Sequence, residues 1–466
     1  MHAIEARVFG KVSVSAVIAH LLDYERVPDD VDGKVGQSAY VGITSSGPFS
    51  PNTNIEHARQ RWLFRMVHSN RPLQEKMTLF WHNHFATASS KVLGSVGTIL
   101  GTKMMANKEG ELPGPPGQLE MLRRNALGKF RDLLVDVARD PAMLVWLDGR
   151  TNTRQRPQEN FGREIMELFT MGVGHYTEQD VYAAARVFTG WNIRRVGPAN
   201  NPGSYYEFVF NASQHEPAAK TFTFPIYPNG SSVIPARVAS DGMQDGLDFI
   251  DALARHPETA RRLARKLWNF FVSETVAPDA NFVSGAAQAY LQNDTDMGAM
   301  VGWVLRSPQF RNLDYAYTRY SWPAEFLVRS IKEVGWNGYS IDSARASLTA
   351  MGQTLYEPPD VAGWELGQGW FSTGAMLARM NFAASLAFNQ RFNLGREATA
   401  ARGTSQELID YFLDKLSPPE YDGAPRGALL EYLNAGTAWP GSDTQLTAKA
   451  AGLTRLIVGS AEYQLM

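Results

Sequence analysis

Cysteine is absent from this chain of 466 residues. Its absence excludes disulfide frameworks, zinc ribbons, iron–sulfur clusters and thiol nucleophiles, so any nucleophile or metal ligand must offer oxygen or nitrogen. An excess of positive charge is also absent, because 45 Lys and Arg face 47 Asp and Glu and the net charge is -2. Without a positive field, the chain is not expected to bind nucleic acid or an anionic membrane surface.

Long apolar runs are missing as well. No stretch approaches the ~18–20 apolar residues of a membrane-spanning helix, so we expect no membrane span. The first residues lack the basic segment, apolar run and small-residue cleavage site of a secretory signal peptide. These residues therefore contain no recognisable targeting signal, and the composition indicates no single compartment.

The composition that is present is typical of a folded globular protein, with 44% hydrophobic and 20% charged residues. At roughly 100–200 residues per domain, the length allows two to four domains or one large domain. We place a soft boundary near residue 240. It divides an N-terminal helical region (1–240), which holds the histidine-rich segment, a Glu-rich helix and a small β insertion, from a C-terminal helical region (241–466), the two packed as one unit.

Apolar residues recur at helical spacing along most of the chain, which predicts a mainly α fold, a multi-helical orthogonal array. The predicted helices are 12–25, 55–69, 72–87, 118–138, 158–172, 177–190, 244–254, 257–273, 296–307, 322–335, 341–353, 375–390, 405–416, 424–434 and 445–459. Residues 30–54 and 101–117 are predicted to be loops or an insertion because they are rich in Gly and Pro. The segments 205–210 and 221–224 are predicted to form a small β-hairpin insertion around 200–225.

A histidine-rich aromatic segment is the first candidate for chemistry, Phe80-Trp81-His82-Asn83-His84-Phe85. In a helix, His82 lies about 200° from His84, so the two imidazoles cannot share one metal. In an extended segment, both imidazoles lie on one face, as in His-x-His metal sites. A third interpretation is a core His84 with a surface His82.

A Glu-rich segment around 158–169 is the second candidate. Asn160, Glu164 and Glu167 follow one edge of its apolar stripe at i, i+4 and i+7, so two carboxylates project side by side. Such a pair can share a proton, ligate a hard cation or bind a basic group. Alternatively, Glu167 forms an ordinary helix salt bridge with Arg163.

A Gly-rich loop opens the next helix and brings His175 and Tyr176 near exposed N–H groups that can hold an anion. Gly172 as a C-cap and Thr177 as an N-cap explain the same loop without a function. The helix that follows presents Arg186 and ends just before Trp191.

Two further segments hold polar or aromatic residues on predicted loops. His215 and Lys220 lie in the hairpin region, where exposed polar residues often carry function. Trp364 and Trp370 lie in a Gly-rich loop after two prolines and are interpreted as exposed, which would suit contact with a sugar or a partner.

Several ordered motifs together resemble the bacterial domain-of-unknown-function 1800 family. They are Phe80-Trp81-His82-Asn83-His84-Phe85, residues 159–172, Tyr176-Thr177-Glu178-Gln179-Asp180-Val181, Phe188-Thr189-Gly190-Trp191, His256-Pro257-Glu258-Thr259-Ala260, Lys266-Leu267-Trp268, Pro323-Ala324-Glu325-Phe326 and Pro358-Pro359-Asp360-Val361-Ala362-Gly363-Trp364. The resemblance spans about residues 55–390 and, in our interpretation, the whole chain. It departs from the family pattern at Phe169, where relatives carry His, and at Glu216, where they carry Asp.

The resemblance implies exported proteins, hence a periplasmic or extracellular place, and a partner similar to sulfatases or alkaline phosphatases. It implies no particular reaction. Two hypotheses follow, and the first is a hydrolase acting on a polysaccharide or ester, with or without a divalent metal ion as cofactor. Its catalytic residues are His82, His84, Glu164, Glu167 and His175, its substrate-binding residues are Asn160, Arg163, Tyr176, Arg186, Trp191, His215, Lys220 and Trp364, and its metal ligands are His84, Glu164 and Glu167. The second hypothesis is a non-catalytic helical protein that binds a glycan or the sulfatase-like partner. The hydrolase depends on whether the His and Glu segments meet in the fold.

Overall fold

The computed structural model describes residues 13–416, 423–436 and 439–466, and α-helices account for most of them. The first half contains α2 (Val14–Leu22), α3 (Ile55–His68), α4 (Pro72–His84), α5 (Ser89–Val96), α6 (Thr98–Ala106), α7 (Gln118–Arg124), α8 (Phe130–Arg139), α9 (Pro141–Trp146), α10 (Asn160–Glu164), a π-helical turn (Ile165–Phe169) and α11 (Glu178–Val187). The second half contains α12 (Met243–Arg255), α13 (Pro257–Phe271), α14 (Ala280–Gln292), α15 (Met297–Arg306), α16 (Pro323–Val334), α17 (Ile341–Ala350), α18 (Thr373–Asn389), α19 (Arg391–Glu397), α20 (Ser405–Leu416), α21 (Ala424–Asn434) and α22 (Asp443–Val458). Short 3-10 turns lie at Tyr24–Arg26, Val31–Lys34, Gly149–Thr151, Ala212–Gln214, Ala239–Asp241, Gln309–Arg311, Leu313–Tyr315, Gly367–Phe371, Thr399–Ala401 and Glu462–Gln464.

The strands form two small antiparallel pairs. Strand β1 (Trp191–Val196) pairs with β2 (Tyr205–Phe210), and β3 (Lys220–Thr221) pairs with β4 (Val233–Ile234). The predicted mainly α class with a small hairpin is therefore confirmed. The expected pairing of 205–210 with 221–224 is wrong, because the segment 191–196 extends away from α11 and supplies the partner strand instead.

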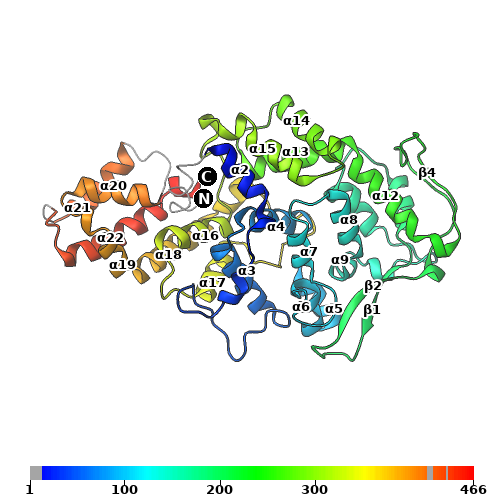
Figure 1. The fold of residues 1–466 in the computed structure, drawn as a ribbon, viewed down its shortest axis with the longest axis horizontal. Helices are drawn as coiled ribbons and strands as arrows, with labels where there is room; N and C mark the ends of the chain where they lie inside the picture. The colour runs from blue at the N-terminus through cyan, green and yellow to red at the C-terminus, as the bar shows by residue number, and fades with distance from the viewer. Residues whose placement is uncertain (1–12, 417–422, 437–438) are drawn as a thin grey trace.

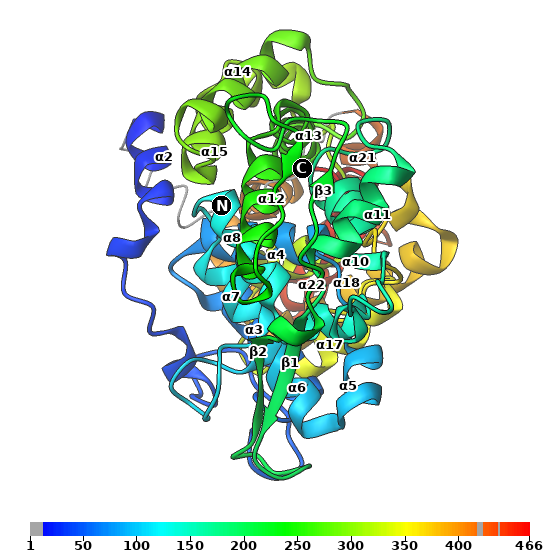
Figure 2. The same ribbon diagram turned by 90° about the vertical axis from the view of Figure 1, so that its right-hand side faces the viewer.

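The molecule is elongated, with its middle built from segments far apart in the sequence (Figure 1). Helices α3 and α4 lie there beside α16 and α17, while the strands and α12 lie at one end and α19–α22 at the other. Seen along its long axis, α4 lies near the centre and the β1–β2 hairpin projects at the edge (Figure 2). One hydrophobic core runs through residues on both sides of position 240, with Trp62, Trp81, Trp191, Trp268 and Trp322 fully buried. The domain boundary near 240 stays a prediction.

Local sequence explains many of the helix starts. Thr177 and Asp180 form a reciprocal capping box at the start of α11, and Asn54 caps α3 through its side-chain oxygen. Pro72, Pro257 and Pro323 occupy first helical turns, where proline costs no hydrogen bond. Starts such as these are where the predicted and observed boundaries agree best.

Tertiary contacts explain two places where the predicted helices are wrong. The single helix expected at 118–138 is broken between α7 and α8, because the carbonyls of Leu127 and Gly128 accept the N–H groups of Gly298 and Met297 at the start of α15. The loop expected from residue 101 is helical up to Ala106. Gly101 lies within α6. A Cβ at this position would lie 2.7 Å from the Cα of Leu93, so the lack of a side chain at Gly101 allows α5 and α6 to pack closely.

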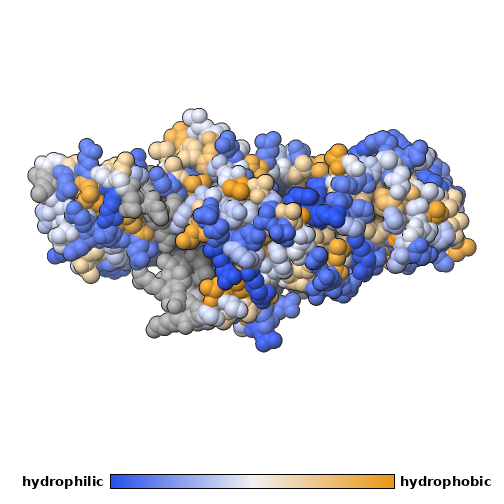
Figure 3. All heavy atoms as spheres, turned by 90° about the horizontal axis from the view of Figure 1, so that it is seen from above, coloured by the Kyte–Doolittle hydropathy of each residue, from blue (hydrophilic) through white to orange (hydrophobic). Residues whose placement is uncertain are grey.

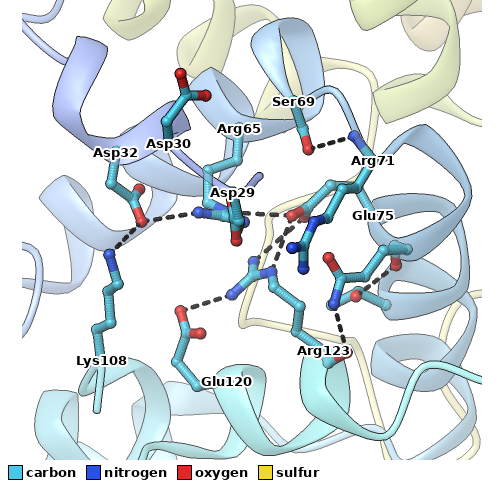
Figure 4. A network of polar contacts seen from close by, with 12 residues as sticks. Asp29, Asp30, Asp32, Arg65, Ser69, Arg71, Glu75, Lys108, Glu120 and Arg123 are labelled. Carbon is cyan, nitrogen blue, oxygen red and sulfur yellow. Dashed lines mark hydrogen bonds and ion pairs between the residues drawn. The ribbon is translucent and has the colours of Figure 1, made fainter. Parts of the chain in front are cut away.

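A buried network of charges joins α3, α4 and α7 to the segment before α3 (Figure 4). Glu75 accepts hydrogen bonds from Arg65 Nε at 3.0 Å and Arg123 Nε at 2.9 Å. Both arginines reach further carboxylates: Arg65 bonds to Asp29 and Asp32, and Arg123 bonds to Glu120. Lys108 adds a bond to Asp32. Every buried charge drawn here has an opposite charge in contact, which is the condition for burying it.

Among the residues that the structure describes, no helix is both long and apolar enough to span a bilayer. The face shown in Figure 3 is mostly hydrophilic, and its hydrophobic side chains lie in small separate groups. Scattered apolar residues of this kind are ordinary at a protein surface.

Candidate functional site

Helix α4 points its two histidines to opposite sides. It is a regular helix through His84, so the extended His-x-His alternative is wrong, and the separation predicted for a helix is confirmed. Both imidazoles are buried, which also makes the interpretation of His82 as a surface residue wrong. The two rings therefore belong to two different environments.

His82 binds the backbone of a distant loop, at a residue with a strained backbone conformation. Its Nε2 accepts the backbone N–H of Tyr356 at 3.1 Å, so the imidazole is neutral with its proton on Nδ1. Tyr356 has a φ of +61°, a left-handed conformation that costs a residue with a side chain about 1–3 kcal/mol. Burial, with a contribution from Arg59, lowers the pKa of His82 to about 3. The ring stacks on Trp364, with centroids 5.4 Å apart.

His84 bridges the Glu-rich segment and α13. Its Nε2 lies 3.0 Å from the carbonyl oxygen of Phe169, and its Nδ1 lies 2.9 Å from Nζ of Lys266. A carbonyl can only accept, so Nε2 carries the proton and Nδ1 accepts a hydrogen bond from Lys266. Burial, together with Lys266 and Arg262, holds the pKa of His84 well below its usual value, which keeps this imidazole neutral.

His84 and α13 bind the backbone carbonyls of Phe169 and Glu167. These carbonyls need a partner outside their own helix because the helix ends at this point. The last carbonyls of a helix have no partner within it and must find one elsewhere. The π-helical turn closes with the N–H of Gly172 bonded to the carbonyl of Met166, and Arg262 donates to the carbonyl of Glu167. The His and Glu segments, separated by about 80 residues in sequence, thus meet in the fold. Single π-helical turns occur frequently at functional sites.

The amine of Lys266 is half-buried and forms no ion pair with any residue that the structure describes. Within 4 Å of its ammonium there is no carboxylate among the residues described here, and its one hydrogen bond runs to neutral His84. Burial, and then the charge of Arg262, lowers the pKa of Lys266 to about 7. At neutral pH a large fraction of this side chain is consequently an uncharged amine, which can act as a base or a nucleophile.

The two glutamates differ in their surroundings. Glu167 accepts a hydrogen bond from the hydroxyl of Tyr176, and burial, with this bond, raises the pKa of the phenol to about 12. Burial and the neighbouring charge of Glu167 raise the pKa of Glu164, while Arg163 opposes the shift. The expected i,i+4 bridge between Arg163 and Glu167 is wrong, because Arg163 forms a bidentate pair with Glu178 at 2.7 and 2.8 Å.

The other predicted residues near the Glu-rich helix lie further from His84. His175 is partly exposed, with Nε2 3.8 Å from a carboxylate oxygen of Glu258. Asn160 donates to Asp148 at 3.4 Å. Neither is hydrogen-bonded to the His84–Lys266 pair. Their roles as catalytic and substrate-binding residues stay predictions.

A second, separate cluster contains the predicted loop residues. His215 and Lys220 are fully buried, so the expectation of exposed polar residues on the hairpin is wrong. Both contact Asp245 of α12, with His215 Nε2 3.2 Å from the carboxylate. Arg237 binds the other oxygen of the same carboxylate. This closed set of ion pairs fixes the β insertion to α12.

Two more predicted residues flank that cluster. Arg186 donates to the carbonyl of Ala219, and Trp191 is buried against Gly246. The interpretation of Trp364 and Trp370 as exposed is also wrong, since their exposed fractions are 6% and 4%. No tryptophan of that loop offers a face to a sugar or a partner. The backbone of Trp364 is tied instead to the side chain of Asn83, which accepts its N–H at 2.8 Å.

In the described part of the chain, no three His, Asp or Glu side chains gather closely enough to hold a metal ion. Of the predicted ligands, His84 has both nitrogens in hydrogen bonds and Glu167 is bonded to Tyr176. A metal on His84, Glu164 and Glu167 stays a prediction.

Sequence reasoning missed Lys266 and Arg262 as site residues. They lie four residues apart on one face of α13, a spacing that many surface helices carry, and Lys266 also begins the motif Lys266-Leu267-Trp268 of the family resemblance. What distinguishes them is their tertiary contacts: Arg262 donates to the carbonyl of Glu167, 95 residues away in sequence, and Lys266 bonds to His84, 182 residues away.

Fold and site together define a mainly helical protein with an imidazole–amine pair at a helix end. The family model described as a protein of unknown function (DUF1800) matches residues 6–465, and the chain belongs to this family. No curated protein and no solved structure matches the chain.

Proposed function

We propose that the protein is a hydrolase that uses Lys266 as its general base and cleaves an ester bond, such as an ester group carried on a polysaccharide. The observation that carries this proposal is the hydrogen bond of 2.9 Å from Lys266 to neutral His84, with no described carboxylate to neutralise the amine. An amine that titrates near pH 7 has the basicity that suits proton transfer at neutral pH. The ester assignment rests on this base, and the polysaccharide on family resemblance alone.

The proposed step needs one base and one acid. The lone pair of Lys266 removes a proton from water as the water oxygen bonds to the ester carbonyl carbon. The bond from that carbon to the alkoxy oxygen then breaks, and the leaving oxygen takes the proton that Lys266 has accepted from water. An amine with a pKa near 7 can both accept a proton and return it at neutral pH.

His84 acts in this proposal as a positioning residue. Because its Nε2–H is fixed on the carbonyl of Phe169, its Nδ1 must accept from Lys266. One hydrogen of the amine is thereby oriented, and the lone pair is directed away from the imidazole. Burial, and then the charge of Arg262, lowers the pKa of this amine and so raises its uncharged fraction at neutral pH.

A substrate-independent experiment tests the state of the amine. Competitive labelling with acetic anhydride across pH 5–10, read by peptide mass spectrometry, reports the pKa of each lysine. We expect Lys266 to titrate near pH 7, and the exposed Lys129, paired with Asp294, to titrate above the usual value of about 10.4. Equal titration of the two lysines would remove the base from the proposal.

Turnover of p-nitrophenyl acetate tests the reaction. We expect the rate to rise with pH through about 7 and to fall by a factor of ~100 or more in Lys266→Met, which keeps the packing and removes the base. Lys266→Arg should also lose activity, since arginine stays protonated. Lys129→Met is the matched control and should retain it. Wild-type rates in a folded Lys266→Met protein would refute the role of the amine.

Metal analysis distinguishes the metal-assisted form of the hydrolase. Elemental mass spectrometry on protein without a His-tag should be run beside the double variant Glu164→Ala/Glu167→Ala. A stoichiometric metal that disappears in the double variant would favour metal-activated water over the amine. Capture with a sulfatase-like protein as bait tests the partner, and export of the full gene product tests the periplasmic or extracellular location.

A further inference from the structure

A cavity of about 530 Å³ lies between α4, α15 and α16, away from the His84–Lys266 pair. Its volume falls in the range of roughly 300–1,000 Å³ that is typical of sites for small molecules. None of its lining residues belongs to the proposed hydrolase site, so the two sites are tested separately. The cavity has so far no role in the function proposed above.

The walls of this cavity are mainly apolar. They come from α2, α4, α13, α15 and α16, and include Leu21, Leu73, Leu79, Phe271, Leu305 and Val328. An apolar molecule that displaces water from such walls gains the free energy of burying its own apolar surface. The body of a suitable ligand is therefore hydrocarbon-like.

The acidic residues on the lining are already satisfied by other side chains. Glu75 is held by two arginines and the indole of Trp62. Glu333 accepts from Arg329 and from the hydroxyl of Tyr463. These two carboxylates have strong internal partners, so the cavity does not rely on a ligand to neutralise them.

One cationic side chain of the cavity lining, Lys76, contacts a carboxylate that already has another cation as its partner. Glu325 is bound by both terminal nitrogens of Arg319, a bidentate pair that satisfies the carboxylate by itself. Lys76 contacts the same carboxylate and lies 4.7 Å from the ring centroid of Phe270. Two cations thus share one carboxylate beside an apolar cavity. Burial, and then the charge of Arg319, lowers the pKa of Lys76 to about 8, while the carboxylates of Glu325 and Glu274 oppose the shift.

We infer that this cavity binds an amphipathic monocarboxylate, a hydrocarbon chain with one carboxylate group, and that the carboxylate contacts Lys76. The positive charge of Lys76 suits one anionic head group, and the apolar walls suit one apolar body. A single carboxylate matches the single charge of the Lys76 ammonium. A cationic amphiphile would meet Lys76 with like charge.

Calorimetric titration of the full chain tests this inference. Dodecanoate should bind at one site and at least about tenfold more tightly than dodecan-1-ol, which has the same chain and no charge. Shorter carboxylates should lose about fourfold in affinity per methylene, the value expected from hydrophobic burial. Dodecyltrimethylammonium should bind more weakly than dodecanoate.

Two variants make the test specific. Lys76→Met should bring dodecanoate and dodecan-1-ol to within about twofold of each other, since the charge that separates them is gone. Val328→Trp should weaken both ligands by filling the cavity without altering the charge. Lys129→Met, at an exposed lysine outside the lining, is the matched control and should change neither. The inference is overturned if dodecanoate does not bind, if the alcohol binds equally well to the unmodified protein, or if Lys76→Met keeps the preference.

Discussion

Removing the negative charge of Glu75 should lower the free energy of unfolding more than removing most other single charges of this protein. The substitution Glu75→Gln keeps the size of the side chain and deletes the negative charge between two arginines. Glu75 accepts from Arg65, from Arg123 and from the indole of Trp62 at 3.1 Å, and it is 4% exposed. Removing one partner of a buried ion pair typically costs about 3–5 kcal/mol.

We expect the lower end of that range, about 3 kcal/mol, because both arginines keep other carboxylates. Arg65 retains Asp29 and Asp32, and Arg123 retains Glu120. With an unfolding entropy of about 2.1 cal/mol/K per residue, a cooperative transition of 466 residues carries about 1 kcal/mol/K. The melting temperature should therefore fall by about 3 °C.

The pH dependence gives the sign of the effect. Burial raises the pKa of Glu75, but Arg123 and Arg65 outweigh burial and hold the pKa below its usual value. A carboxyl with a lowered pKa stabilises the fold above its unfolded pKa and loses this contribution as pH falls through the folded pKa. The gap in melting temperature between wild type and Glu75→Gln should be constant near neutral pH and shrink in acid.

Differential scanning calorimetry measures this gap, with Glu207→Gln as the matched control. Glu207 lies in an exposed pair with Arg194 on the hairpin, and such pairs contribute little. The reasoning is refuted if Glu75→Gln melts no lower than Glu207→Gln at neutral pH, or if its gap to wild type widens in acid.

Three further substitutions probe other buried features. Asp245→Asn leaves Lys220 buried without its counter-charge and should cost about 3–5 kcal/mol, measured by urea unfolding. Gly246→Val should cost about 1–3 kcal/mol or more in the same assay, because a Cβ there would lie 2.2 Å from the ring of Trp191. Burial raises the pKa of Asp140 to about 7, so its contribution to stability is complete below its usual pKa and is lost as pH rises through 7. Asp140→Asn, which stays neutral and still caps α9, should therefore raise the melting temperature more at pH 8.5 than at pH 5.

Matched controls exist for all three. Asp132→Asn removes a charge at a half-exposed position and should change stability little at either pH. Gly33→Val places a side chain where no atom lies within 4 Å and should not reproduce the loss at Gly246. Destabilisation by these controls as large as in the test variants, or an Asp140→Asn effect independent of pH, would contradict the proposed causes.

Helix geometry made part of the site predictable. The rotation of about 100° per residue places His82 and His84 on different sides of α4, and the structure has them there. Capping residues such as Thr177 also marked real helix starts. These features depend on interactions within a few residues, so a sequence pattern carries them.

The predictions that were wrong or missing concern side chains whose contacts come from distant parts of the sequence. Lys266 resembles any lysine of an amphipathic helix until His84, 182 positions away, is placed beside it. Lys220 is buried because Asp245 comes from a different element, and a polar hairpin segment gives no sign of this. Trp364 is covered because the loop folds back on Asn83. In each case the partner is set by tertiary packing.

The arrangement of the last helices has a consequence for how the molecule opens. Helices α19–α22 pack on one another at one end and join the rest mainly through α16 and α18 (Figure 1). A group of elements with mostly internal contacts can unfold as one cooperative unit while the remainder stays native. In native-state hydrogen exchange we expect their amides to exchange together and ahead of those of α4 and α13. The end of the molecule formed by the last helices would then unfold first, while the imidazole–amine pair and the apolar cavity in the middle remain native.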